Sequence, residues 1–441
     1  MTALQKVASK VPQHDAQPDW TRIEDVLRRI RILRLDIRVD KVILRKVASH
    51  IADCNLQAMP RLKQFIWDQS CSWTQYLSDG EVYGILSEHP YTFWTHILPL
   101  LGPHFNTLTD LDLKHRSYFN RDDHRDGGSD LPLTFHSQMV NTQWGALTIL
   151  STEFAMSTAT IISLGRSPIL RELHCTASSD QLADIAMEKG PFFAALERFS
   201  LDIKGFCDPS DWADAHDFLS FIAVHAGNLW QLTVKLHEHE PADDDDMTSC
   251  IGEISSALAL IKGLRCIELV LPITPLALRE SPFFFPFYVP FSAFQPLYDL
   301  KFLTALYVRG LHVLISPLDV PTIPWPFLEA LELLPSAWDQ DWQALCGGME
   351  PGVSCPVELA ARDLYAIAKS HPRLSYLAVQ AHTQDCALGL PPEANWTPQL
   401  HVGKVIVSLH DCVQPDLEVA SAYLKILFPN ADICSADDEN Y

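Results

Sequence analysis

The chain has 441 residues, of which 47 % are hydrophobic and 20 % are charged, so its composition is that of a folded protein. Its length exceeds the size at which one compact core stops growing, which favours several domains or a stack of repeats. The formal net charge of −22 repels phosphate backbones and excludes nucleic acid as the expected partner.

A short pattern, apolar-x-x-apolar-x-apolar, recurs along the chain. Its copies span residues 30–35, 62–67, 108–113, 170–175, 196–201, 229–234, 264–269, 303–308, 328–333 and 374–379, with a weaker copy at 147–150 and a last apolar strand at 405–409. The last two apolar residues of each copy are two apart, so they lie on the same side of a strand. Because so short a strand cannot bury its face alone, the pattern predicts parallel strands stacked on one another.

Helical segments precede several of these strands. Residues 212–226, 253–261 and 358–369 carry apolar side chains at helical spacing, and a glycine or a proline follows each segment. Strands that alternate with helices are joined by parallel crossovers, so we predict an α/β fold.

The strand copies resemble the leucine-rich-repeat family over roughly residues 25–410. More narrowly, residues 327–333 (Phe-Leu-Glu-Ala-Leu-Glu-Leu) and the ending 423–430 are similar to the F-box/leucine-rich-repeat-like proteins of mushroom-forming fungi. The resemblance implies an irregular leucine-rich-repeat solenoid, a horseshoe with short parallel strands on its concave face and helices on its convex face.

The same resemblance implies a substrate receptor of a Skp–cullin–F-box ubiquitin ligase, but the sequence has no recognisable F-box. The asparagine or cysteine that usually follows each strand is also mostly absent; Lys114 follows Leu113, for example. The chain is therefore either a truncated relative of these receptors, which would need a Skp-type adaptor, or a binding module without ubiquitin chemistry.

The spacing of the copies is irregular and predicts insertions. Successive copies lie between 23 residues (Leu147 to Leu170) and 46 residues (Leu328 to Leu374) apart, whereas regular leucine-rich repeats take about 20–29 residues. We expect a tail at 1–22, a solenoid at 23–430 with insertions near 115–135, 238–250, 275–300 and 335–360, and an acidic C-terminal tail at 431–441.

Residues between the inward-facing apolar positions point to the concave face, where we expect a protein partner to bind. They are Arg34, Asp36, Asp112, Lys114, His174, Asp202, Lys204, Thr233, Lys235, Glu268, Tyr307, Arg309, Glu332, Tyr376 and Gln380. Charges of both signs alternate along this face, which suits electrostatic selection of a protein surface. Tyr307, Arg309 and Tyr376 belong to the residue types that most often anchor interfaces. The alternative is that solenoid strands carry polar residues there whatever their function.

No sequence motif indicates catalysis. The motifs G-x-S-x-G, G-x-x-x-x-G-K-[ST] and G-x-G-x-x-G are absent from the sequence, so we expect no enzyme activity and no cofactor.

The densest group of metal-ligating residues is His237-Glu238-His239-Glu240 with the aspartates at 243–246. Two histidines on one face of a strand suit zinc or copper, but we interpret this segment as a solvated acidic loop without metal. A metal-binding protein or an enzyme that uses this loop is the alternative.

The remaining features concern location. The 11 cysteines include no C-x-x-C pair, which is typical of a reducing compartment, and residues 1–20 contain no apolar signal segment. The apolar stretch 281–297 contains four prolines, which exclude a membrane-spanning helix. We therefore expect a soluble protein of the cytoplasm or nucleus.

The phenylalanines at 283–294 either pack between two repeats or form an exposed apolar binding patch, and burial is the commoner fate.

Overall fold

The structure is a computed structural model of the chain. It describes residue 25 and residues 28–36, 61–68, 107–114, 145–204, 209–236, 244–271, 288–334, 359–381, 397–409 and 417–435. Contacts within the chain divide it into two compact units. Unit 1 comprises residues 1–177 and 187–199, and unit 2 comprises residues 178–186 and 200–441.

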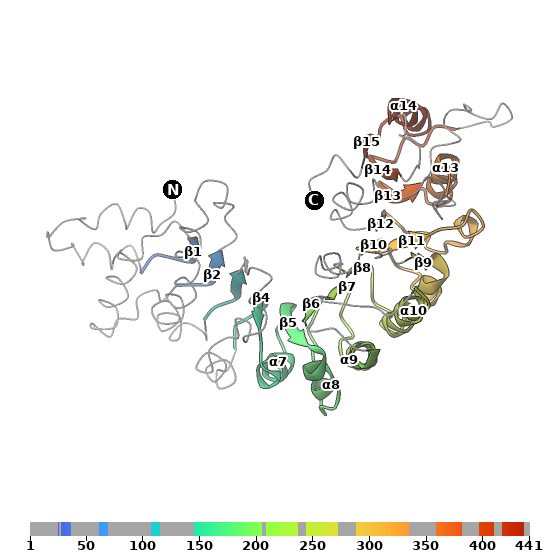
Figure 1. The fold of residues 1–441 in the computed structure, drawn as a ribbon. Helices are drawn as coiled ribbons and strands as arrows, with labels where there is room; N and C mark the ends of the chain where they lie inside the picture. Colours follow the sequence, from blue (N-terminus) through green and yellow to red (C-terminus); the bar gives the residue numbers. More distant parts are fainter. Residues whose placement is uncertain are drawn as a thin grey trace, which may run out of the picture. The chain divides into compact units, whose positions relative to one another are not determined.

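Unit 1 is built on parallel strands, each from one copy of the apolar pattern (Figure 1). They are β1 (Ile32–Asp36), β2 (Gln64–Asp68), β3 (Asp110–Lys114), β4 (Ile149–Ala155) and β5 (Glu172–Ser178), paired in sequence order. One apolar residue from each strand lies at the same register, and all five are at most 7 % exposed: Leu33, Phe65, Leu111, Leu150 and Leu173. Helix α7 (Thr158–Gly165) follows β4, and its N-cap Ser157 accepts a hydrogen bond from the backbone N–H of Thr160 at 3.3 Å.

Unit 2 continues the same construction. Its strands are β6 (Arg198–Lys204, whose first two residues belong to unit 1), β7 (Gln231–Leu236), β8 (Cys266–Val270), β10 (Ala305–Arg309), β12 (Ala330–Leu334), β13 (Tyr376–Ala381), β14 (Lys404–Leu409) and β15 (Asp432–Ser435). From β7 onward each strand pairs in parallel with the next, and a column of fully buried residues runs through the register: Leu232, Ile267, Leu306, Leu331, Leu377 and Val405.

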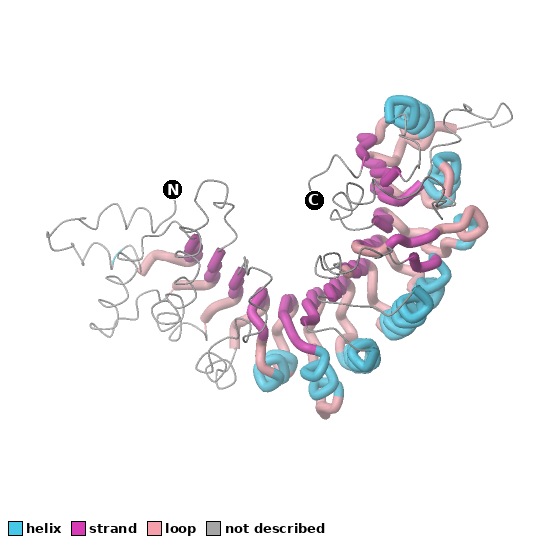
Figure 2. Tube along the Cα trace, in the orientation of Figure 1, coloured by secondary structure: helices cyan, strands magenta, loops and turns pink. Residues whose placement is uncertain are grey.

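The helices of unit 2 lie on one side of its strands (Figure 2). They are α8 (Ser179–Ala186), α9 (Pro209–His225), α10 (Asp244–Leu260), the 3-10 helix η5 (Phe291–Asp299), α13 (Ala361–Ser370) and α14 (Leu417–Leu427), with a short 3-10 turn η6 (Val320–Thr322). Neighbours in sequence also pack together, as α8 does on α9, α9 on α10, and α10 on η5. We call the opposite side of the sheet the strand face.

A four-residue turn precedes many of the strands in unit 2. The leucine that opens each copy donates its backbone N–H to the carbonyl three residues earlier, from Leu229 to Ala226 at 3.1 Å and from Leu303 to Leu300 at 3.1 Å, for example. These leucines have no exposed surface. The first apolar residue of the pattern is therefore buried where the chain turns into the strand, as the sequence predicts.

The predicted α/β leucine-rich-repeat construction is confirmed by these strands, because every copy of the pattern forms a parallel strand. The three predicted helices correspond to α9, α10 and α13. Two differences are visible. Strand β15 extends the sheet past residue 430, where we expected the solenoid to end, and β9 (Tyr288–Pro290) pairs with β11 (His312–Leu314) in a separate parallel sheet.

The second half of the phenylalanine-rich stretch is buried. Phe291 and Phe294 have no exposed surface, and the Phe291 ring lies 6.4 Å from the Trp325 ring, centroid to centroid. The indole N–H of Trp325 donates to the carbonyl of Leu297 at 3.0 Å, so the buried ring keeps its polar group satisfied. This part of the stretch packs between repeats, while residues 283–287 lie outside the described residues, as do most of the expected insertions.

Candidate partner-binding face

Five neighbouring strands of unit 2 place one row of side chains on the strand face. Thr233, Glu268, Tyr307, Glu332 and Ala378 occupy the same register on β7, β8, β10, β12 and β13. Their neighbours along each strand point the opposite way, into the apolar column, because side chains alternate along a strand. Sequence positions far apart are thus brought into one row.

Arg309, two residues beyond Tyr307, joins two glutamates of this row. Its Nε and Nη2 donate to the two carboxylate oxygens of Glu332, the second at 3.2 Å, and its Nη1 donates to Oε1 of Glu268 at 2.8 Å. The bidentate pair fixes the plane of the guanidinium. The Glu332 side chain is only 4 % exposed, whereas the Arg309 side chain keeps 39 % of its surface exposed. The arginine therefore covers a buried carboxylate and still faces solvent.

Two tyrosines and a threonine complete the group. The Tyr376 hydroxyl donates to Oε2 of Glu332 at 2.8 Å, and the Thr233 hydroxyl donates to Oε2 of Glu268 at 3.0 Å. The Tyr307 and Tyr376 ring centroids are 6.4 Å apart, and Cζ of Arg309 lies 5.6 Å from the Tyr307 centroid. We call the six residues, Thr233, Glu268, Tyr307, Arg309, Glu332 and Tyr376, the arginine cluster.

Hydrogen bonds and burial shift the pKa values of two residues in this cluster. The hydrogen bonds to Glu332 raise the pKa of Arg309, although burial of the guanidinium opposes them. Burial also raises the pKa of Tyr307, with smaller contributions from Cys266 and Glu332, so its phenol stays neutral. Counted by residue type, with two glutamates and one arginine, the cluster has a formal net charge of −1.

Cys266 lies beside the cluster on β8. Burial, and secondly the charge of Glu268, raise the pKa of its thiol to about 11. Since the thiolate is the reactive form, Cys266 is an unreactive apolar residue at neutral pH. Cys266 is therefore not an activated nucleophile.

The strand face of unit 2 extends to β6 and to the C-terminal strands. Nζ of Lys235 lies 3.6 Å from Oδ1 of Asp202, and Lys204 is exposed. Gln380 is different, because it is only 4 % exposed and its Nε2 lies 2.8 Å from Nδ1 of the buried His312. Gln380 therefore lies beneath the surface, whereas Tyr307, Arg309 and Tyr376 reach it.

The other predicted site residues belong to unit 1. Asp112 on β3 and His174 on β5 are half-buried, and both share a register with Ser151 on β4. The backbones of Arg34, Asp36 and Lys114 lie in β1 and β3, but their side chains lie outside the described part of the structure. The predicted residues are thus divided between the two units, and six of those in unit 2 form the arginine cluster.

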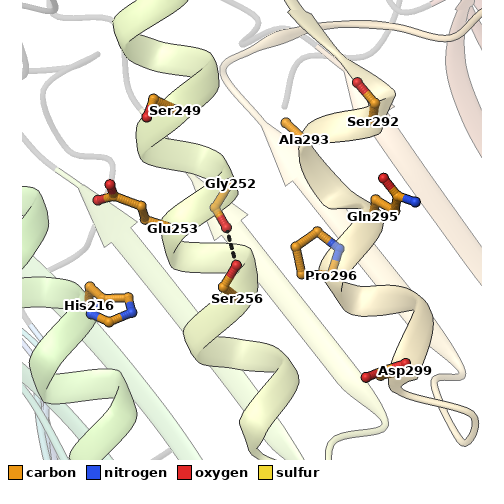
Figure 3. A pocket seen from close by; sticks show the side chains of 10 residues that line it. All are labelled: His216, Ser249, Gly252, Glu253, Ser256, Ser292, Ala293, Gln295, Pro296 and Asp299. Carbon is orange, nitrogen blue, oxygen red and sulfur yellow. Dashed lines mark hydrogen bonds between the residues drawn. The ribbon is translucent and has the colours of Figure 1, made fainter.

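A second feature, on the helix side of unit 2, has no counterpart in the sequence predictions. An open groove of about 730 Å³ lies between α9, α10 and η5 (Figure 3). Its lining combines polar and apolar surface from His216, Ser249, Gly252, Glu253, Ser256, Ser292, Ala293, Gln295, Pro296 and Asp299. The Ser256 hydroxyl donates to the Gly252 carbonyl at 2.8 Å, within its own helix.

Metal binding and membrane insertion find no support in the described residues. No three His, Cys, Asp or Glu side chains among them are placed to hold a metal ion. Residues 237–243, which include the histidines of the acidic segment, lie outside the described ranges. None of the described helices has both the length and the apolar character needed to cross a bilayer.

Two solved structures are distant matches to this chain. No family model and no curated protein sequence matches the chain. An internalin from Listeria monocytogenes is 11 % identical over 100 % of this chain and 94 % of its own, with a TM-score of 0.38. A leucine-rich-repeat protein from Leptospira interrogans is 10 % identical over 92 % of this chain and 90 % of its own, with a TM-score of 0.33. At these values neither likeness assigns a family or a function, and the fold rests on the strands themselves.

Proposed function

We propose that this chain is a protein-binding module and that the strand face of unit 2 contacts its partner through the arginine cluster. The observation that carries the proposal is the ion-pair and hydrogen-bond network that holds Arg309 between Glu268 and Glu332. Tyr376 is tied to the same network by its hydroxyl. The network places two tyrosines and an arginine, the residue types of interface hot spots, side by side at the surface.

The fixed geometry favours binding. An arginine and two tyrosines that are free to rotate would lose side-chain entropy when a partner docks, whereas these are already held by Glu332 and by one another. The partner therefore meets an ordered surface. This is a physical reason for burying Glu332 at the centre of the row, because a buried carboxylate is tolerated only when charged and hydrogen-bonding partners surround it.

The formal charge of the arginine cluster indicates the chemistry of the partner. The cluster has a formal net charge of −1 and the whole chain a formal net charge of −22. A partner that offers hydrogen-bond donors or cationic side chains to this face would be attracted and correctly oriented, whereas an acidic one would be repelled. We therefore propose a basic protein surface as the ligand of the arginine cluster.

Affinity capture with the tagged full chain tests this proposal. Tyr307→Ala removes a half-buried ring without taking away a hydrogen-bond partner of the buried Glu332, so the fold should persist. We expect recovery of the captured protein, quantified by mass spectrometry, to fall at least tenfold, since loss of a hot-spot aromatic costs about 2 kcal/mol or more.

Val224→Ser is the matched control. Val224 lies on α9, on the helix side of the same unit, and is 78 % exposed. This variant should recover the partner as the wild-type chain does, and both variants should keep the urea midpoint of the wild type. Equal recovery with Tyr307→Ala and wild type would refute the assignment of the arginine cluster.

A role as a ubiquitin-ligase substrate receptor in the cytoplasm or nucleus stays a prediction from the family resemblance. It requires a segment that docks on a Skp-type adaptor. Co-purification of the full chain with a Skp adaptor and a cullin is the expected result if the resemblance extends to function. Recovery of the partner without these proteins would leave the chain as a binding module outside ubiquitin ligation.

A further inference from the structure

The turns that precede the strands of unit 2 form an edge of their own. Three residues before each strand, at equivalent register, the chain carries Asn228, Gly263, Phe302, Phe327, Arg373 and His401 in successive repeats. Since neighbouring parallel strands lie about 4.8 Å apart, planar side chains at this position can stack along the edge. None of these residues belongs to the arginine cluster.

Three of them form a stack. The Phe302 and Phe327 rings are 6.2 Å apart between centroids and inclined by only 14°, and Cζ of Arg373 lies 4.9 Å from the Phe327 centroid. We call Phe302, Phe327 and Arg373 the edge ladder. Phe302 stands at its end and is 62 % exposed, although a phenylalanine at a surface usually buries most of its ring.

The repeat geometry leaves the next step of the ladder without a side chain. The position beside Phe302 is Gly263, where a Cβ would lie 2.9 Å from the carbonyl oxygen of Leu229. The backbone of the preceding repeat approaches too closely for a larger residue to fit without a shift. Gly263 therefore presents no side chain to the ring of Phe302, and the ladder stops with that ring exposed.

The surroundings of this exposed ring are basic. Lys301, Arg265 and Arg373 are exposed, and Lys262 also lies in the turn, 3.7 Å from Asp299. On the described part of the edge only Asp299 and Glu329 oppose these four cations. A locally positive patch is unusual in a chain with a formal net charge of −22, and at physiological ionic strength charges more than about 8 Å away are largely screened.

We infer that this edge binds an acidic segment of a protein, which places an aromatic side chain on Phe302 at the step left vacant by Gly263. The lysines and arginines attract the acidic residues of the segment, and the ring of Phe302 receives the aromatic group in an offset stack. The site is separate from the strand face, so the inference does not depend on the proposed function. A nucleobase would also stack there, so single-stranded nucleic acid is one outcome of the test.

Selection from a phage-displayed library of random peptides, about 12 residues long, tests the inference with the intact chain as bait. Phage that bind the Phe302→Ser variant are removed first. We expect the remaining peptides to contain an aromatic residue flanked by aspartate or glutamate. Synthetic copies should bind wild type at least tenfold more tightly than Phe302→Ser or Lys301→Glu, as measured by fluorescence anisotropy, and Tyr307→Ala should bind them as wild type does.

Both edge variants change exposed residues, so an unchanged urea midpoint will show that they fold. The inference is overturned if no peptide distinguishes wild type from Phe302→Ser, or if the selected peptides are basic or lack an aromatic residue. Binding of a single-stranded oligouridine that depends on Phe302, in the absence of peptide binding, would replace the protein segment with a nucleic acid.

Discussion

Gly310 follows β10 with a φ of +87°, in the left-handed region that residues with a side chain rarely adopt. A Cβ at this position would lie 1.8 Å from the carbonyl oxygen of Leu271. The backbone around it is fixed, because Gly310 donates its N–H to Leu334 at 3.1 Å and Leu271 donates to Arg309 at 2.9 Å. A side chain here would push apart the strands that carry Glu268 and Arg309.

Gly310→Ala should therefore lower the free energy of unfolding by about 2–4 kcal/mol, since it adds backbone strain to a direct clash. Urea unfolding followed by circular dichroism measures the change. Gly252→Ala is the control, because Gly252 lies in α10 and a Cβ there meets nothing within 4 Å. That variant should gain about 0.5–1 kcal/mol from helix propensity. A Gly310→Ala variant as stable as wild type would contradict the packing described here.

At the scale of elements, helices α8 and α9 bring several aspartates together. Burial raises the pKa of Asp214, and the charges of Asp211, Asp180 and Asp217 raise it further, in that order. A folded-state pKa above the unfolded value of 3.8 means that the protonated form is favoured in the fold. The stability gained by protonation is present below pH 3.8 and is lost as the pH rises through the folded pKa. At pH 7 the charged Asp214 therefore destabilises the α8–α9 pair.

Asp214→Asn should raise the free energy of unfolding at pH 7 by about 0.2–1 kcal/mol, the range for partly solvated charges. The gain should shrink as the pH falls through the folded pKa and be lost well below pH 3.8, where the carboxyl is protonated in both states. Asp432→Asn, which removes one exposed charge from β15, controls for net charge and should change stability less. An Asp214→Asn gain that persists unchanged at pH 3.5 would rule out this electrostatic explanation.

At the scale of the whole molecule, the chain has 55 acidic and 33 basic residues. Exposed pairs such as Arg29–Asp25, with 2.7 Å between Nη2 and Oδ2, offset little of this excess, because each contributes less than about 1 kcal/mol. Repulsion among the unbalanced carboxylates opposes folding and falls as salt screens it. The effect belongs to the whole chain rather than to one site.

Raising KCl from about 0.02 M to about 0.3 M should consequently raise the midpoint of thermal unfolding at pH 7. Scanning calorimetry measures the shift, and sucrose at matched osmolality is the control for excluded-solute effects. A midpoint that falls with added KCl would show that the ion pairs stabilise the chain more than the excess negative charge destabilises it.

The sequence by itself determined the strands and the main helices. Each copy of the apolar pattern forms a strand because the alternation that buries Leu306 and Val308 and turns Tyr307 outward is a property of a few adjacent residues. The leucine that opens each copy is buried in the turn for the same local reason. The pattern does not predict β15, because Ile433 has too few apolar neighbours at the required spacing. It does not predict β9 or β11 either, because each of these strands is only three residues long.

The sequence also placed the residues of the arginine cluster on one face, since an outward position follows from the alternation alone. It did not show which of them touch. Arg309 is 41 residues from Glu268 and 23 residues from Glu332 in the sequence. The segments between them differ in length from repeat to repeat, so the sequence spacing does not predict these contacts. The same holds for the edge ladder, because Phe302 and Phe327 carry no shared motif and meet only through strand register.

Only the tertiary structure decided which outward residues are accessible. Glu332 and Gln380 occupy outward positions as Tyr307 does, yet both are nearly buried, Glu332 under Arg309 and Tyr376 and Gln380 against His312. Alternation along a strand fixes the direction of a side chain, a property of neighbours in sequence. Whether that side chain is buried, and which residues it contacts, depends on the side chains that neighbouring strands and connecting segments place around it. Those neighbours come from distant parts of the sequence and are fixed only when the repeats stack.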